Sequence, residues 1–96
     1  MQITGDMTNA TFAFYEEDHT LGNLLRNQIV KNKNVEFCAY SVPHPSEPIC
    51  NVRVQCAEGK TDSHTALRHG LKRISKMCDV LDEKFEEALS AFQKSQ

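Results

Sequence analysis

The segment 67–92 reads LRHGLKRISKMCDVLDEKFEEALSAF, and its apolar residues recur in alternating steps of four and three. We call these eight residues the seam: Leu67, Leu71, Ile74, Cys78, Leu81, Phe85, Ala88 and Phe92. An unbroken heptad pattern of this kind is typical of a helix that packs along another helix. The seam therefore predicts one long C-terminal helix with an apolar stripe.

The length of this helix decides what can cover the stripe. Thr61, Asp62 and Ser63 are good capping residues, and no proline follows before Phe92. A helix of about 28 residues extends about 42 Å, whereas a strand of about six residues covers only about 20 Å. A small sheet of the same chain can cover the start of the seam but not its end, which favours packing against a helix of another chain.

Charges on the predicted helix are segregated. Four basic residues lie in its first half, and five acidic residues lie in its second half: Arg68, Lys72, Arg73, Lys76, then Asp79, Asp82, Glu83, Glu86 and Glu87. This order opposes the helix dipole and places like charges four residues apart. A partner with compensating charges would relieve the repulsion, although a solvated polar face also tolerates it. An antiparallel homodimer is the main rival to a heterodimer, because the basic half of one helix could face the acidic half of its copy.

The remaining chain predicts a small antiparallel sheet and one shorter helix. Strands are expected at 2–4, 11–15, 35–42 and 49–57, and a helix capped by Asp18 or Thr20 at 20–31. With 96 residues, the chain is expected to form a single domain over 1–96. The predicted fold class is α+β, a two-layer sandwich in the order strand, strand, helix, strand, strand, helix.

The two later strands differ in how clearly they show a core face. The strand 49–57 alternates, with Cys50, Val52, Val54 and Cys56 on one side, which predicts one buried and one solvated face. Both faces of the strand 35–42 are moderately apolar, so its core face stays open. The connection 43–48 contains three prolines and is predicted to be a loop.

Composition excludes several classes of function. A net charge of −2 argues against a chain that itself grips nucleic acid, and no direct sequence-specific contact with nucleic acid is expected. No apolar run reaches the roughly 20 residues that a membrane span requires, and residues 1–20 show no pattern from which a secretion signal is expected. The four cysteines lack C-x-x-C spacing and are interpreted as reduced core thiols.

No catalytic, cofactor-binding or metal site is predicted. Asp18 and His19 beside further acidic residues could form a hydrolytic site on paper, but acidic residues already have a role at a helix N-terminus. His64 and His69 are five residues apart, which is not the spacing that aims two histidines at one metal ion. No phosphate-binding glycine motif occurs.

The most specific motif lies on the first predicted helix. Residues 17–26 read EDHTLGNLLR, with Gly22 inside the helix, where glycine costs about 1 kcal/mol relative to alanine. Close approach by another backbone is the expected reason. The string resembles the signature of the small α-like subunits of archaeal and eukaryotic RNA polymerases, and the resemblance continues over most of residues 11–92. Residues 37–38, 45–47 and 78–86 look more like the subunit shared by polymerases I and III, whereas 42–45 is closer to the polymerase II form.

The resemblance implies a non-catalytic assembly subunit located in the nucleus, including the nucleolus. Such a subunit pairs with a larger α-like subunit and forms a platform for the two large catalytic subunits. Together with the seam, it gives a predicted set of interface residues: Leu21, Gly22, Asn23, Leu25, Arg26, Leu67, Leu71, Ile74, Cys78, Leu81, Phe85 and Phe92. Arg26 is expected either to anchor a polar contact or to be an ordinary exposed arginine.

Overall fold

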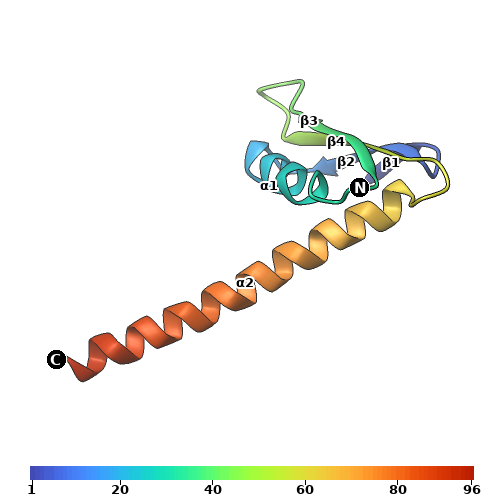
Figure 1. Ribbon diagram of the computed structural model, residues 1–96. Helices are drawn as coiled ribbons and strands as arrows, with labels where there is room; N and C mark the ends of the chain where they lie inside the picture. The colour runs from blue at the N-terminus through green and yellow to red at the C-terminus, as the bar shows by residue number, and fades with distance from the viewer.

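The computed structural model describes all 96 residues. It contains four strands and two helices in the predicted order (Figure 1). Their bounds are β1 Gln2–Gly5, β2 Asn9–Tyr15, α1 His19–Ile29, β3 Val35–Ser41, β4 Ile49–Cys56 and α2 Ser63–Lys94. The predicted α+β class is confirmed.

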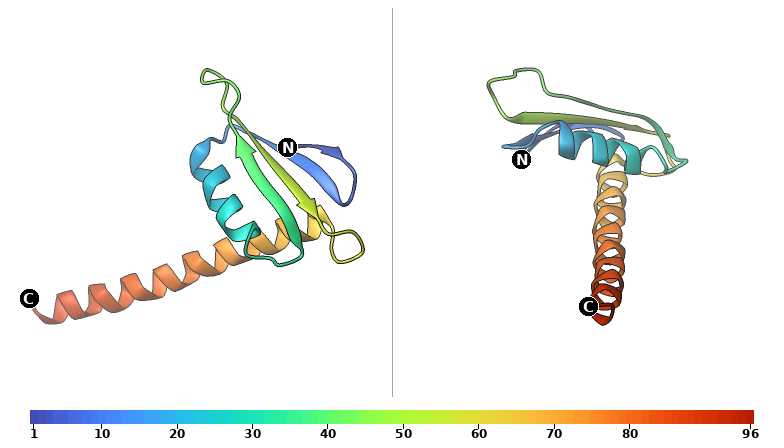
Figure 2. Two further views of the ribbon diagram at one scale, coloured as in Figure 1. Left: turned by 45° about the horizontal axis from the view of Figure 1, so that its top comes forward. Right: turned by 90° about the vertical axis from the view of Figure 1, so that its left-hand side faces the viewer.

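The strands form one antiparallel sheet in the order β1-β2-β4-β3. Both helices lie on the same side of this sheet, so the molecule has two layers and one face of the sheet is free of helices (Figures 1 and 2). α2 contacts α1, β4 and β2. The order of the elements and the layer architecture both follow the prediction.

The opening hairpin depends on Gly5 and Asp6. Gly5 has a φ of 106°, a left-handed conformation that favours glycine, and a Cβ there would collide with the carbonyl oxygen of Asn9. The Asp6 carboxylate accepts hydrogen bonds from the backbone N–H groups of Thr8 (3.0 Å) and Asn9 (2.7 Å). These contacts close the turn between β1 and β2.

A bulge in β3 explains why its sequence showed no single core face. The register with β4 shifts between Val35 and Phe37, which leaves Glu36 unpaired. Beyond the shift, Cys38 is buried and Tyr40 packs against the core, whereas Phe37 is exposed on the other face. Because of the extra residue, Val35 also packs against the core. An odd-numbered residue before the bulge and even-numbered residues after it therefore lie on the same face of the strand.

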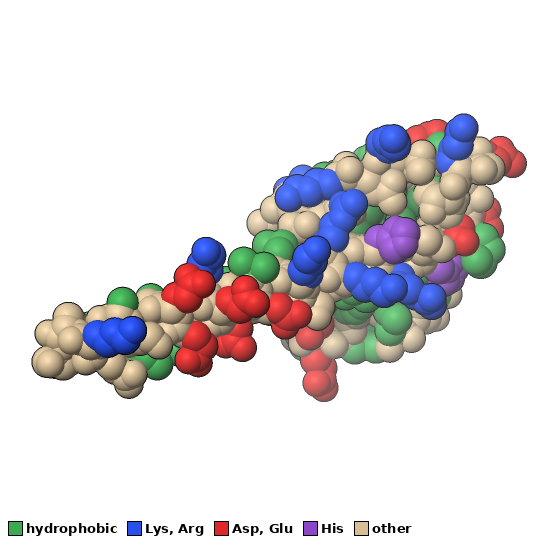
Figure 3. Space-filling view, turned by 60° about the horizontal axis from the view of Figure 1, so that its bottom comes forward, with side chains coloured by type: hydrophobic (Ala, Val, Ile, Leu, Met, Phe, Trp, Pro, Cys, Tyr) green, Lys and Arg blue, Asp and Glu red, His purple; other side chains and the backbone are tan.

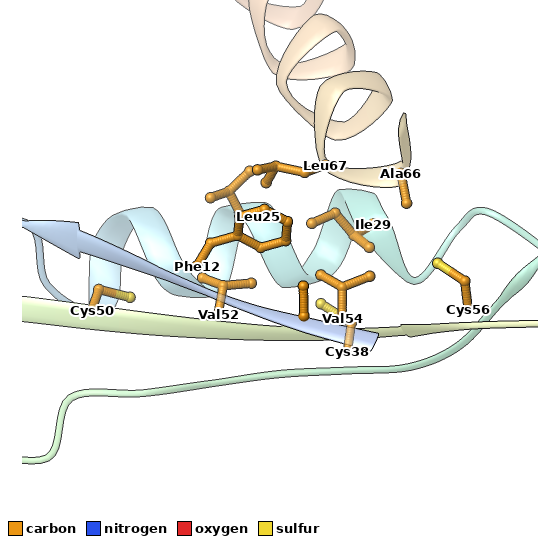
Figure 4. Close-up of a cluster of buried hydrophobic side chains, with 11 residues drawn as sticks. Phe12, Leu25, Ile29, Cys38, Cys50, Val52, Val54, Cys56, Ala66 and Leu67 are labelled. Carbon is orange, nitrogen blue, oxygen red and sulfur yellow. The ribbon is translucent and has the colours of Figure 1, made fainter. Parts of the chain in front are cut away.

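The core lies between the sheet and the two helices (Figure 4). The alternation predicted for β4 is confirmed, because its four inward residues are all buried. The core comprises eleven residues from β2, α1, β3, β4 and the start of α2: Ala10, Phe12, Leu25, Ile29, Cys38, Cys50, Val52, Val54, Cys56, Ala66 and Leu67.

Element ends differ slightly from the prediction. α1 ends at Ile29 rather than residue 31, because the chain turns where the Asn32 N–H donates to the Ile29 carbonyl (3.0 Å). Asp18 is its N-cap and accepts from the Thr20 N–H at 2.9 Å. α2 is longer than predicted and continues to Lys94, and Asp62 caps it by accepting from the Thr65 N–H at 2.6 Å.

Candidate interaction surface

The seam divides into a part that packs on its own domain and a part that does not. All four buried residues of α2 lie between Ser63 and Gly70. Leu67 is 6% exposed and Ile74 packs partly against the core, whereas Leu81 is 68% exposed and Phe85 is 61% exposed. Beyond Ile74 the helix leaves the sheet and projects alone (Figures 1 and 2).

We call the projecting part, residues 75–94, the overhang. Its seam residues are all exposed, and Met77 and Val80 add further apolar surface at 44% and 47% exposure. Burying one large apolar side chain stabilises a protein by about 1.5 to 3 kcal/mol. Covering Leu81, Phe85 and Phe92 would therefore contribute several kcal/mol, which is comparable with the total stability of a small domain.

A shallow groove extends the apolar surface toward the N-terminus. It has a volume of about 200 Å³ and lies between β1 and the first turns of α2, with Met1, Ile3, Leu67 and Leu71 among its lining residues. Met1 and Ile3 are exposed. The sequence does not reveal this extension, because only the following turn indicates β1 and the residues of the strand show no apolar pattern.

The charges of α2 are segregated in space as in sequence. Figure 3 shows carboxylates gathered on the projecting helix and Lys and Arg side chains over the globular part. The single ion pair in the chain joins Lys84 and Glu87 at 3.9 Å, and both side chains are exposed. Apart from Glu87, the like-charged residues along α2 therefore have no ion-pair partner within this chain, and compensation by a partner chain stays a prediction.

Gly22 has a different role from the predicted one. A Cβ at this position would lie 2.6 Å from Cδ2 of the Tyr40 ring and 2.7 Å from Sγ of Cys50. The expected close approach by another backbone is thus wrong, because side chains of the chain's own sheet occupy the space. Gly22 lets α1 sit close to β3 and β4.

The other predicted residues of α1 fall into two groups. Leu25 is completely buried in the core and Leu21 packs partly against it, so both lie behind the surface. Asn23 is exposed and Arg26 half-buried, and the Arg26 guanidinium donates to Asn23 Oδ1 at 3.0 Å. Among the predicted interface residues of α1, this pair is the part that a partner can reach.

The cysteines, like the seam residues, are buried in the globular part and exposed on the overhang. Cys38, Cys50 and Cys56 are buried, which agrees with the interpretation as core thiols. That interpretation is wrong for Cys78, which is exposed on the overhang. Burial raises the pKa of all three buried thiols, that of Cys38 to about 11. They are therefore neutral at physiological pH.

No group of three or more His, Cys, Asp or Glu side chains is arranged to hold a metal ion. Neither helix combines the length and the apolar composition needed to cross a membrane. The most prominent functional feature is thus an apolar helix surface that its own domain leaves open.

Residues 9–84 match the family described as the RNA polymerase Rpb3/Rpb11 dimerisation domain. The chain belongs to this family. The resemblance found in residues 17–26 is thereby confirmed, and an uncovered helix surface is what a dimerisation domain presents before it pairs. A solved structure, subunit L of the DNA-directed RNA polymerase of Thermoplasma acidophilum, shares the fold with a TM-score of 0.80. It is 20% identical, and the match covers 99% of this chain and 93% of that one.

Curated relatives are similar over most of this chain. The chain is 51% identical over 86 residues to DNA-directed RNA polymerases I and III subunit RPAC2 of Saccharomyces cerevisiae, covering 90% of this chain and 60% of that protein. It is 50% identical to the subunit of the same name of Schizosaccharomyces pombe, covering 90% of this chain and 68% of that protein. The chain thus spans about three fifths to two thirds of the length of these two relatives.

Two relatives from one organism separate the paralogues. The chain is 42% identical to the polymerase I and III subunit of Dictyostelium discoideum, over 83% of this chain and 68% of that protein. It is 32% identical to the polymerase II subunit rpb11 of the same organism, over 84% of this chain and 61% of that protein. The predicted similarity to the polymerase I and III form is confirmed, despite the polymerase II-like residues 42–45.

Proposed function

We propose that this chain is a non-catalytic assembly subunit of DNA-directed RNA polymerases I and III. In this role it forms a heterodimer with the larger α-like subunit, and the pair is the platform on which the two large catalytic subunits assemble. It acts in the nucleus, including the nucleolus, and needs no cofactor. The overhang carries the proposal, because its apolar residues have no cover within the chain.

From the exposure of the predicted residues we infer which of them would meet the partner. Leu71, Cys78, Leu81, Phe85 and Phe92 are exposed along one stripe of α2 and form the proposed contact. Leu67 and Ile74 connect that stripe to the core. Asn23 and Arg26 would make polar contacts, whereas Gly22 and Leu25 hold α1 in place from behind.

The test is the solution mass of the chain, measured by light scattering alone and after co-expression with the larger α-like subunit of the same organism. A stable one-to-one complex is expected, and the lone chain should associate only weakly with itself. A tight homodimer that ignores the larger subunit would refute the proposal and support the homodimeric alternative. Preferential pairing with the larger subunit of polymerase II would support the equivalent role in that enzyme instead.

Charge substitutions locate the contact. Leu81→Asp or Phe85→Asp should abolish pairing, because a carboxylate would be buried without compensation. Ser90→Asp is the matched control, since Ser90 is exposed on α2, about 150° around the helix from the seam, and receives the same charge. Circular dichroism should show an unchanged fold for all three variants. Equal loss of pairing in the control would place the contact elsewhere.

A further inference from the structure

A polar concavity lies beside α2 and away from the seam. We call it the basic bay. It has a volume of about 580 Å³ and is formed by the connection between α1 and β3, the connection between β4 and α2, and the first three turns of α2. None of its nine lining residues is hydrophobic: Lys31, Asn32, Lys33, Asn34, Lys60, Thr61, Thr65, His69 and Arg73.

The bay concentrates positive charge in an otherwise acidic chain. Lys31, Lys33, Lys60 and Arg73 contribute four positive charges, and no acidic side chain is among the lining residues. The whole chain has a formal charge of −2, so everything outside these four side chains carries −6. None of the four forms an ion pair, because the single pair in the chain lies on the overhang. Every lining side chain can also donate a hydrogen bond.

Backbone and side-chain contacts hold the walls of the bay in position. The Arg73 guanidinium donates to the Gln28 carbonyl at 3.0 Å, which fixes one end of the guanidinium and leaves its other N–H groups free. Asn32 Oδ1 accepts from the Asn34 N–H at 3.0 Å, and the Val35 N–H donates to the Asn32 carbonyl at 3.0 Å. The Arg73 guanidinium and the backbone of the connection between α1 and β3 are thus ordered before any ligand arrives, which lowers the entropic cost of binding.

The bay and the seam occupy different sides of α2. Thr65, His69 and Arg73 follow one another at intervals of four residues and lie on average about 150° around the helix from the seam, at 100° per residue. A partner helix lying on the seam would leave the bay open. The bay is therefore a second surface, available to another segment in the same assembly.

We propose that the basic bay binds an acidic polypeptide segment of a further protein, independently of pairing through the seam. His69 has the one aromatic ring in its lining, and there is no Phe, Tyr or Trp on which successive bases could stack. The acidic residues of α2 begin at Asp79, six residues beyond Arg73 and so about 9 Å along the helix. A nucleic-acid strand leaving the bay in that direction would meet these carboxylates, whereas a short cluster of Asp and Glu side chains would not.

Fluorescence anisotropy with a labelled oligoglutamate peptide tests the proposal on the full chain. The triple variant Lys31→Gln/Lys33→Gln/Lys60→Gln should weaken binding about tenfold or more, as three partly exposed charge contacts are lost. The matched control is Lys76→Gln/Lys84→Gln/Lys94→Gln, which removes the same charge from α2 outside the bay and should change the affinity less than about twofold. Both triples replace surface side chains, and circular dichroism should report an unchanged fold.

The seam variant Phe85→Asp separates this proposal from the proposed function, because it should lose pairing and still bind the peptide. Equal weakening by the two lysine triples would overturn the proposal, since binding would then follow total charge. Absence of peptide binding to the unmodified chain would also overturn it. Tighter binding of oligothymidylate than of the peptide, lost in the bay triple, would overturn the choice of an acidic polypeptide as ligand.

Discussion

Replacing Leu67 and Phe85 separately with alanine should show that one end of the seam stabilises the fold and the other end binds the partner. Leu67 is 6% exposed and packs in the core, whereas Phe85 is 61% exposed on the overhang. We expect Leu67→Ala to destabilise the lone chain and Phe85→Ala to weaken only the complex with a partner.

The expected magnitudes follow from burial. Truncating a buried leucine to alanine costs about 2 to 5 kcal/mol, because transfer energy is lost and a cavity remains. Truncating an exposed side chain usually changes stability by less than about 0.5 kcal/mol. If Phe85 becomes buried on pairing, its truncation should cost the complex about 3 kcal/mol, or roughly a 150-fold rise in Kd.

Two measurements on each variant are sufficient. Urea unfolding of the lone chain, followed by circular dichroism at low protein concentration, gives the free energy of unfolding. Titration of the larger α-like subunit gives Kd. The reasoning is refuted if Phe85→Ala destabilises the lone chain as much as Leu67→Ala does, because the overhang would then pack within the chain. It is equally refuted if Phe85→Ala leaves Kd unchanged.

Three further predictions concern the globular part. Gly22→Ala should destabilise the chain by about 1 to 2 kcal/mol in urea unfolding, because overpacking against the Tyr40 ring outweighs the gain in helix propensity. Asp62→Ala should destabilise the chain at neutral pH, because the Asp62 carboxylate caps α2 and the hydrogen bond from the Thr65 N–H lowers its pKa. That contribution is present above the ordinary aspartate pKa of about 3.9 and is lost as pH falls through the lower folded value, so unfolding curves of the two proteins should converge in acid. Burial raises the pKa of Cys38 from 9.0 to about 11. The contribution of this neutral thiol to the free energy of unfolding is therefore complete below about pH 9 and is lost as pH rises through about 11. Cys38→Ala should make the stability of the chain fall less steeply over this alkaline range, and an unchanged slope would exclude this thiol as the cause.

Much of the fold could be predicted because the local patterns agree with the tertiary structure. The alternation in β4 and the heptad steps in α2 each identify one apolar face, and both faces are where the patterns place them. The overhang followed from length alone, since a helix of this size exceeds the span of a small sheet. Most of the residues expected at the partner contact on α2 are exposed, but Leu67 is buried in the core and Ile74 packs partly against it.

The remaining features depend on contacts that are distant in sequence. The bulge at Glu36 changes which residues of β3 face the core, and no residue type in that strand predicts it. The neighbours of Gly22 come from β3 and β4, so the sequence showed that space was needed but not what filled it. The basic bay combines lysines from two separate connections, each of which looks like an ordinary polar loop when taken by itself.

The projecting half of α2 has a consequence for the life of the unassembled protein. Helix propensity alone gives a protein helix little stability in water, and tertiary contacts of its apolar face usually supply most of it. Without a partner, the overhang has almost no such contacts, so it should fray far more often than the globular part opens. Proteases and chaperones recognise exposed, locally unfolded apolar segments, and assembly would remove that signal by ordering the helix. The exposed apolar residues of the overhang would thus mark an unassembled subunit for degradation, and their burial would protect an assembled one.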